Sequence, residues 1–568
     1  MDPATALVDA LTALRTAAAD ASFPLATPSA PEAVRVAGRV VRQIDDYVLP
    51  RLDRLDAPLL VVVGGSTGAG KSTLVNSIVM APVSAAGVLR PTTRGPVLVS
   101  HPADAAWFTE RHLLPSLART PAHRPVAGTP DEDTVQVISA PALAPGLALL
   151  DVPDIDSVVG ENRQLATRLL DVADLWLFVT TAARYADAVP WRVLRGARDR
   201  DTVLAMVLDR VPAGAEDDLA AHLRQMLAAQ QLGGTAMFVV PEVPVDGSGL
   251  LPDDVVAPLR EWLASLAADA QSRAAVIRTT LAGAVGSLAA DVDTLALAAD
   301  EQNRAWNGLD RAASDAYADA EDSIATAVTG GAVLRGEALP EWQRFVGSGE
   351  LARTLRTRRR PLRSAVSRRG LPGADLRAAL TAGIAALIEE HTAGAAERAA
   401  AAWRASPAGS SLVTAALGGP ARGLPERCRG LVRDWQRAVN RLAGEAQRRG
   451  GRRDRVGGGP AAAATALLAT VAVCASPALV PTGAEVAAAG GTAASTQRSL
   501  EAVSAGESVR RLAQDARDDL FGRVHALLAA EAGRFTQARD AVDLDPALSA
   551  RLRSAARTVT RLSAADAP

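Results

Sequence analysis

The alternation of apolar and polar positions divides the chain into two halves of different kinds. Between residues 57 and 265, short apolar runs alternate with segments that have one apolar face. From about residue 266 onward, alanine-rich segments carry Leu or Val every three or four positions. The first pattern predicts a mostly parallel sheet with flanking helices, and the second predicts helices alone. We therefore predict an α/β domain followed by an all-α bundle, with strands at 59–63, 97–100, 147–151, 174–180, 202–208 and 236–240.

The same pattern sets the expected domain boundaries. Residues 1–50 are predicted as an N-terminal helical arm, broken near Pro24 to Pro31. Residues 51–265 form the α/β domain, and residues 266–568 form a helical bundle or stalk that is expected to contain coiled coil. Glycine and proline divide this last region into roughly six helices. The expected breaks lie at 330–331, 361, 370–372, 418–420 and 457–460.

A glycine-rich segment follows the first predicted strand and leads into an apolar helix. It matches the pattern G-x-x-x-x-G-K-[ST] through Gly65, Gly70, Lys71 and Ser72. Glycines let successive backbone N–H groups turn inward and form an anion cradle at a helix N-terminus. Lys71 would contact the outer phosphates, and the Ser72 hydroxyl would bind Mg²⁺. The alternative is a chance glycine-rich turn. The predicted nucleotide-binding residues of this segment are Gly65, Ser66, Thr67, Gly68, Ala69, Gly70, Lys71, Ser72 and Thr73.

Lysine usage supports this interpretation. Lys71 is the only lysine in the 568 residues, and the remaining basic residues are arginines. A compact ammonium fits between phosphates where a planar guanidinium does not. The only lysine of the chain therefore lies at the one position where phosphate binding requires an ammonium group rather than a guanidinium group.

Composition narrows the class of protein. The net charge of −2 gives no overall bias toward nucleic acid, and we predict no specific nucleic-acid partner. Cys428 and Cys474 lie far apart, without metal-binding spacing, which suits a reducing cytoplasm. Residues 1–25 lack a basic stretch followed by a long apolar core, so we predict no secretory signal.

Two further motifs follow the glycine-rich loop. A loop after the first helix contains Thr92 and Thr93, either of which is a candidate for binding Mg²⁺ and the γ-phosphate; the alternative is a polar surface turn. The strand at 147–151 ends in Asp151, which would hold Mg²⁺ through water. Together the three motifs predict a triphosphate site at the carboxyl ends of the strands.

At these residues the chain resembles a dynamin-like or Era-like P-loop GTPase, over roughly residues 57–265. The resemblance implies GTP as substrate, with Mg²⁺ held by Ser72, Thr92, Thr93 and Asp151. It also implies that the backbone N–H of Asp154, at a usual glycine position, meets the γ-phosphate. The expected catalytic residues are Lys71, Ser66, Thr92 and Thr93, Ser66 being placed where the dynamin-like group often carries a glutamine.

The sequence does not decide which purine base the site would bind. The guanine-reading motif of such GTPases should follow the strand at 203–208, where this chain has Asp209, Arg210 and, two residues on, Pro212. Arg210 could lie over the base, and Asp209 could replace the missing aspartate if the register shifts. We expect GTP, with ATP or a relaxed site as the alternative.

The helical half contains a candidate membrane segment. Residues 456–484 carry no charge, and arginines stand on both sides of the stretch 456–497. This pattern predicts a hairpin that enters a membrane and keeps both ends on the cytoplasmic side. The alternative is an alanine-rich helix pair buried in the bundle. A basic run at 353–369 is a second candidate lipid contact, or a solvated helix face.

The order of these segments resembles that of bacterial dynamin-like proteins, in which a GTPase head is joined to a helical stalk with a membrane-binding tip. The resemblance implies a GTPase at the cytoplasmic face of the cell membrane that couples GTP hydrolysis to self-assembly or membrane organisation. Its expected partners are lipid and a second copy or a related GTPase. The alternatives are a soluble switch GTPase with a helical partner scaffold, and a P-loop ATPase with a degenerate base site.

Overall fold

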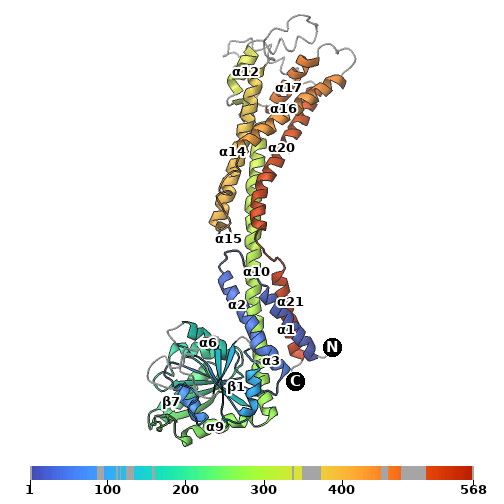
Figure 1. The fold of residues 1–568 in the computed structure, drawn as a ribbon. Coiled ribbons are helices and arrows are strands. Elements are labelled where there is room, and N and C mark those ends of the chain that lie inside the picture. Colours follow the sequence, from blue (N-terminus) through green and yellow to red (C-terminus); the bar gives the residue numbers. More distant parts are fainter. Residues whose placement is uncertain are drawn as a thin grey trace. The chain divides into compact units, whose positions relative to one another are not determined.

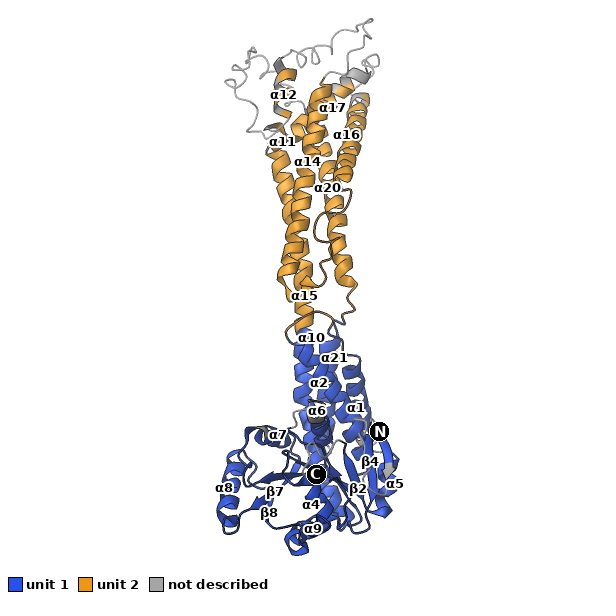
Figure 2. Cartoon of the chain, turned by 60° about the vertical axis from the view of Figure 1, so that its left-hand side comes forward, with its two compact units in different colours: residues 1–23, 29–300, 545–568 blue, residues 24–28, 301–544 orange. Residues whose placement is uncertain are grey.

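The chain divides into two compact units, which are described separately (Figure 2). Unit 1 comprises residues 1–23, 29–300 and 545–568, and unit 2 comprises residues 24–28 and 301–544. The structure is a computed structural model. It describes residues 3–85, 95–110, 113–114, 117–122, 134–156, 160–335, 338–347, 373–449, 458–474 and 507–565.

Unit 1 is built on an eight-stranded sheet in the order β3-β4-β2-β5-β1-β6-β7-β8. Every neighbouring pair is parallel except β2 and β5. The strands are β1 Leu59–Gly65, β2 Val97–Ser100, β3 Ala118–Ala122, β4 Thr134–Ser139, β5 Leu147–Asp151, β6 Leu175–Thr181, β7 Val203–Val211 and β8 Ala236–Pro241. The six predicted strands and the mostly parallel sheet are confirmed, whereas β3 and β4 were not predicted.

Strand β1 lies inside the sheet, between β5 and β6. Alternate side chains point to opposite faces of a strand. Leu60 and Val62 accordingly enter one hydrophobic core, and Leu59, Val61 and Val63 enter another. Helices cover both faces, which explains why the strand is apolar at every position.

Helices on the two sides of the sheet fill these two cores. Figure 1 shows α6 and α9 on opposite sides of the strands, in agreement with the cores to which they contribute. The helices that surround the sheet are α4 Lys71–Ile78, α5 Ala105–Thr109, α6 Gly160–Leu170, α7 Ala188–Arg198, α8 Glu216–Ala229 and α9 Asp253–Ala267.

The N-terminal helices pack on the same unit. The predicted break near Pro24 to Pro31 is confirmed, because one helix ends before it and the next begins at Ala30. Leu7, Leu11 and Leu14 of the first helix are buried, and this helix packs against the last helix of the chain. The elements involved are α1 Pro3–Ala19, α2 Ala30–Gln43, the π-helical turn Ile44–Val48, α3 Leu49–Asp53, the start of α10 Ala270–Thr329, and α21 Leu548–Ala565.

A buried ion pair joins these N-terminal helices to the sheet. Asp174, just before β6, accepts hydrogen bonds from Leu60 N at 2.7 Å and from Tyr47 Oη at 3.1 Å, and it pairs with Arg51. Both members of the pair are fully buried. Burial raises the pKa of Asp174, while the charge of Arg51 opposes that rise. The contact fixes α3 against the amino ends of β1 and β6.

Unit 2 contains only helices among its described residues, as predicted. Its core is largely alanine and leucine around Trp403, Trp435 and Phe535, which are fully buried. The indole N–H of Trp403 donates to Leu309 O at 2.9 Å, and that of Trp435 donates to Ala516 O at 2.7 Å. The helices are the end of α10, α11 Ala332–Arg335, α12 Ala338–Gly347, α14 Ala374–Ala405, α15 Pro407–Ser410, α16 Leu424–Arg449, α17 Gly458–Cys474 and α20 Glu507–Asp540.

The predicted apolar hairpin at 456–497 is described only in part. Helix α17 covers 458–474, and it packs against α16 and α20 with Leu467, Val471 and Val473 buried. This burial is what the alternative of a buried helix predicts for that part. Residues 475–497 and the basic run 353–369 lie outside the described residues.

One described helix, α10, is long and apolar enough to cross a membrane by length and composition. Its apolar window is 44% buried inside the protein. Core helices of soluble proteins pass the same test, so this finding alone gives no membrane span.

Candidate nucleotide-binding site

The glycine-rich loop joins the end of β1 to the start of α4. Gly70 has a left-handed backbone with φ of 91°, and a Cβ there would lie 2.3 Å from Asp209 Oδ2. A Cβ on Gly65 would lie 2.1 Å from Val179 O of β6. Both positions therefore require glycine for a steric reason. The carbonyl of Gly70 accepts the first helical hydrogen bond, from Leu74 N at 2.8 Å, so α4 begins where the loop ends.

The loop encloses the ammonium group of Lys71. Its Nζ donates to Gly65 O at 3.2 Å and to Ser66 O at 3.3 Å, and it pairs with the Asp154 carboxylate. The residue is only 5% exposed. Because these contacts come from the start of the loop and from the segment after β5, the charge is held at a fixed point over the loop.

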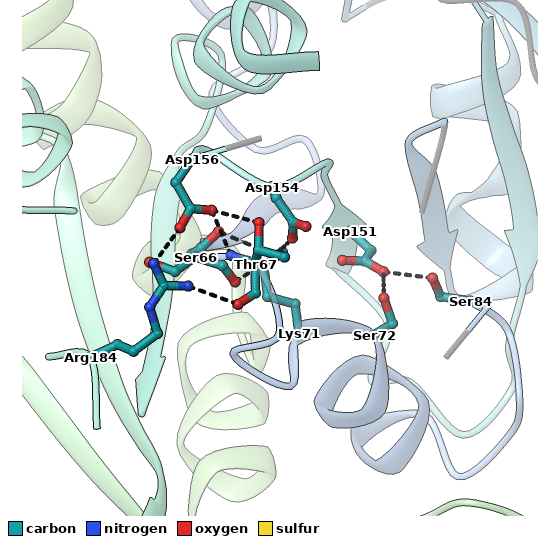
Figure 3. A network of polar contacts seen from close by, with 10 residues as sticks. Ser66, Thr67, Lys71, Ser72, Ser84, Asp151, Asp154, Asp156 and Arg184 are labelled. Carbon is teal, nitrogen blue, oxygen red and sulfur yellow. Dashed lines mark hydrogen bonds and ion pairs between the residues drawn. The ribbon is translucent and has the colours of Figure 1, made fainter. Parts of the chain in front are cut away.

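Ser72 and Asp151 meet at the first turn of α4. Ser72 Oγ donates to Asp151 Oδ2 at 2.7 Å, and Ser84 Oγ donates to the same oxygen at 2.6 Å (Figure 3). Asp151 is fully buried, and burial raises its pKa against the opposing effect of these two hydroxyls. Its other oxygen, Oδ1, is buried and has no hydrogen bond with the described residues. An orphaned buried carboxylate oxygen beside a serine hydroxyl fits a hard divalent cation.

A second cluster holds Thr67, in the middle of the loop. Asp156 Oδ1 accepts from Thr67 N at 2.6 Å and from Thr67 Oγ1 at 2.8 Å. Arg184 donates to Thr67 O at 3.0 Å and to Asp156 Oδ2 at 2.7 Å (Figure 3). Although burial opposes the change, the hydrogen bonds from Thr67 and Arg184 lower the pKa of Asp156. The cluster ties the loop to the segments after β5 and β6.

The other predicted loop residues lie in different surroundings. Ser66 is fully buried, and its hydroxyl makes no hydrogen bond within the described part of the chain. Ala69 is buried, whereas Gly68 is partly exposed with φ of 73°. Thr73 lies in α4, and its carbonyl accepts from Ser77 Oγ. Thr92 and Thr93 fall outside the described residues.

Asp209 packs directly against the loop, at Gly70. Its Oδ1 accepts from Arg210 N at 2.8 Å, and the residue is 8% exposed. Burial raises the pKa of Asp209 to about 6. Arg210 has φ of 54°, and its side chain is 53% exposed, while Pro212 is exposed beyond it. The strand end thus presents Asp209 to the loop and Arg210 to solvent.

The glycine-rich loop, Asp151 at the end of β5 and Asp209 of β7 therefore meet at the carboxyl ends of the strands. The register pairs Val63 with Asp151 and Gly65 with Val179, so β5 and β6 both end beside the loop. The antiparallel strand β2 is next to β5. The fold is a mostly parallel α/β sheet with a P-loop at its strand ends, followed by helices.

No family model and no curated protein matches the sequence. Among solved structures, the chain is similar to Era from Aquifex aeolicus bound to GDP and AlF4⁻, at 17% identity and a TM-score of 0.23. That likeness covers 36% of this chain and 56% of the Era chain, so this chain matches little more than half of Era.

The chain is also similar to two structures of an oligomerised bacterial dynamin pair, described as a mechanism for long-range sensing and tethering of membranes. Each has 9% identity and a TM-score of 0.40, and they cover 98% and 96% of this chain and 95% and 96% of their own. These solved structures are of the Era and bacterial dynamin kinds that the sequence resembles. At these values it assigns no role to any residue.

The structure of this P-loop domain adds three residues that sequence motifs missed. Asp156 belongs to the acidic run after β5 that begins with Asp151, and this run was a usable signal. Ser84 and Arg184 lie outside every motif, and only folding brings them to Asp151 and Thr67.

Proposed function

We propose that the chain binds and hydrolyses GTP with Mg²⁺ at the P-loop. The observation that carries the proposal is the start of α4, where Gly70 forces the loop to turn. There Lys71 is held over the loop and Ser72 is bonded to Asp151. A fixed ammonium, backbone N–H groups at a helix N-terminus and a hydroxyl-carboxylate pair are the groups that a magnesium triphosphate requires.

Each group has a definite task in this proposal. Lys71 neutralises the outer phosphates, and loop amides bind their oxygens, apart from those of Thr67 and Ala69, which donate to Asp156 and to Ser66 O. Ser72 and Asp151 would hold Mg²⁺, with Thr92 or Thr93 as further ligands. The cation, when bound, neutralises charge that develops on the phosphate oxygens. The backbone of Asp154 would face the γ-phosphate.

Hydrolysis needs a group that orients water. Ile155, which follows Asp154, is 5% exposed and offers only its backbone. The Ser66 hydroxyl is buried without a hydrogen bond among the described residues, whereas Thr67 is partly exposed beside Asp156. We therefore expect slow basal turnover that a partner or a second copy accelerates.

Relaxed base specificity is the second candidate, and one observation favours it. Asp209 is turned toward Gly70 of the loop, and the side chain of Pro212 has no acceptor atom for the N–H groups of guanine. Arg210 remains available to stack on either purine. A panel of GTP, ATP, XTP and their diphosphates separates the two candidates.

Association with the cytoplasmic face of the cell membrane and self-assembly belong to the same proposal. The stretch 456–497, uncharged over 456–484 and flanked by Arg455 and Arg498, supports it. So does the membrane tethering described for the bacterial dynamin pair. A soluble switch GTPase with a helical scaffold is the alternative, and flotation of the full chain with vesicles distinguishes them.

The direct test of catalysis is phosphate release from GTP at fixed Mg²⁺. We expect Ser72→Ala and Asp151→Asn each to lower the rate at least about tenfold and to raise the Mg²⁺ concentration needed for half activity. Ser77→Ala, on the same helix but bonded to Thr73 O and Leu251 N, is the matched control. Equal rates in all four proteins would remove Ser72 and Asp151 from the site.

A further inference from the structure

Helix α16 of unit 2 carries a row of arginines on its exposed side. Cys428, Val432, Trp435 and Val439 form its buried side. On the exposed side, the arginines recur mostly at four-residue spacing, and this row is called the arginine face. Its members are Arg429, Arg433, Arg437, Arg441 and Arg448, all exposed.

The arginine face is long and continuous. At about 1.5 Å per residue, the nineteen-residue step from the first to the last arginine spans about 28 Å. At about 100° per residue, all five lie within about 120° of the helix circumference. Guanidinium groups therefore form a band along one side of the helix, and α14, α17 and α20 pack elsewhere on it.

Few acidic groups balance this band. Glu426 pairs with Arg429 at 2.8 Å, and Asp434 pairs with Arg437. Arg433 and Arg441 make no hydrogen bond or ion pair with another residue that the structure describes. Arg427 is set apart from the band, because it pairs with the buried Glu531. Helix α16 carries three carboxylates, Glu426, Asp434 and Glu445, against the five arginines of the arginine face, so the band keeps a net positive charge.

The surrounding sequence indicates which anion the band fits. Beyond α16, the chain continues with Arg452, Arg453 and Arg455 and then with the uncharged stretch 456–484. Positive charge leading into an apolar segment is the pattern of a surface next to anionic lipid. Positions between the arginines, such as the exposed Asn440 and the half-buried Gly444, offer no aromatic ring on which a base could stack.

We propose that the arginine face of α16 binds the anionic headgroups of a lipid bilayer. The proposal rests on the membrane association proposed above and names the surface that performs it. Each arginine near a charged bilayer contributes roughly a fivefold gain in partitioning, so three of them account for roughly a hundredfold. Because the contact is electrostatic, it weakens with salt.

The test uses the full chain and vesicles of phosphatidylcholine with or without phosphatidylserine. The face variant is Arg433→Gln with Arg441→Gln and Arg448→Gln. The control variant is Arg311→Gln with Arg557→Gln and Arg561→Gln, which are exposed arginines of α10 and α21. Both variants lose the same charge, and neither touches the P-loop. GTP hydrolysis without vesicles reports on unit 1, and helix content and thermal unfolding by circular dichroism report that unit 2 is folded.

We expect the wild type and the control variant to float with phosphatidylserine vesicles at low salt, and the face variant to bind roughly a hundredfold more weakly. Equal binding by the two variants would overturn the proposal and leave a solvated helix face. Tighter binding to an oligonucleotide than to vesicles, lost in the face variant, would overturn it in favour of nucleic acid.

Two further outcomes separate this proposal from its premises. Asp315, Asp319 and Asp322 form an exposed acidic row on α10. If the face variant changes the self-association of the protein without vesicles, the band binds a second copy instead and the proposal fails. If the wild type binds no vesicles but still hydrolyses GTP, membrane association and the lipid-binding face both fail while the nucleotide site stands.

Discussion

The carboxylate of Asp154 lies beside the ammonium of Lys71, where the outer phosphates of a nucleotide would bind. The backbone keeps it there, because Ile155 N bonds to Gly65 O at 3.4 Å. A carboxylate and a γ-phosphate are like charges, and about 5 Å apart at an effective dielectric constant of 20 they repel by up to about 3 kcal/mol. Asp154 should therefore oppose the triphosphate more than the diphosphate.

We predict that Asp154→Asn tightens GTP binding about tenfold and GDP binding less. Titration calorimetry with both nucleotides measures the difference. Asp199→Asn, an exposed aspartate paired with Arg198, is the control and should change neither affinity. Weaker GTP binding by Asp154→Asn would show instead that the carboxylate helps to hold the nucleotide or its cation.

Asp209 gives a prediction about pH. Its pKa of about 6 in the folded protein lies above the unfolded value of 3.8 because the carboxylate is buried. The folded state thus binds the proton more tightly, and stability is lost as the pH rises from about 4 to about 6. Two pKa units correspond to about 3 kcal/mol. We predict that Asp209→Asn raises the free energy of unfolding by about 1–3 kcal/mol at pH 8 and by little at pH 4.

Urea unfolding of both proteins at the two pH values measures this effect. The amide keeps an oxygen that can accept from Arg210 N, so the loop contact is preserved. A stability difference that is the same at pH 4 and pH 8 would contradict the assigned titration.

At the residue scale, the local sequence pattern predicts only some of the residues of the site. Gly65, Gly70, Lys71 and Ser72 were found because their spacing along the chain itself creates the phosphate cradle. Asp151 was found because it ends an apolar strand. Arg184 was missed because its contact with Thr67 joins residues 117 positions apart, and nothing in its own neighbourhood marks it.

Among the elements, α3 depends on one buried charge pair. Arg51 and Asp174 are both fully buried, and removing one partner leaves the other charged and unpaired. We predict that Arg51→Met lowers the free energy of unfolding by about 3–5 kcal/mol at pH 7. Adding Asp174→Asn should recover part of the loss, because the remaining carboxamide still accepts from Leu60 N.

Chemical denaturation of the two variants and of Arg54→Met tests this prediction. Arg54 is three residues away, and its side chain is 59% exposed, so we expect a change within about 0.5 kcal/mol. A loss for Arg51→Met no larger than that for Arg54→Met would mean that the pair does not anchor α3.

At the element scale, the sequence pattern failed to predict strands β3 and β4. β4 is mostly buried, but Gln136 interrupts its apolar run, and β3 contains Pro121, which disfavours a strand assignment. Both lie at one edge of the sheet, in the order β3-β4-β2. Pairing with a neighbouring strand, rather than local propensity, decides their conformation.

For the whole molecule, periodicity predicted the change from a sheet with helices to helices alone, and the structure confirms it in the described residues. It did not predict that residues 545–568 return to unit 1, where α21 packs on α1. That contact joins the two ends of the chain through small and aliphatic side chains, which look alike in every alanine-rich helix of this sequence. Which of these helices pack together depends on the complementary shapes of their surfaces, and the spacing of apolar residues along the sequence does not specify those shapes.

The central claim is that a single lysine closes a cradle of backbone amides around a magnesium triphosphate. Titration calorimetry of the full chain with GTP and ATP, each with and without Mg²⁺, tests it most directly. We predict one GTP site that needs Mg²⁺, weaker heat with ATP, and a loss of at least about a hundredfold in affinity for Lys71→Ala. No heat with either triphosphate, or equal binding by Lys71→Ala, would contradict it.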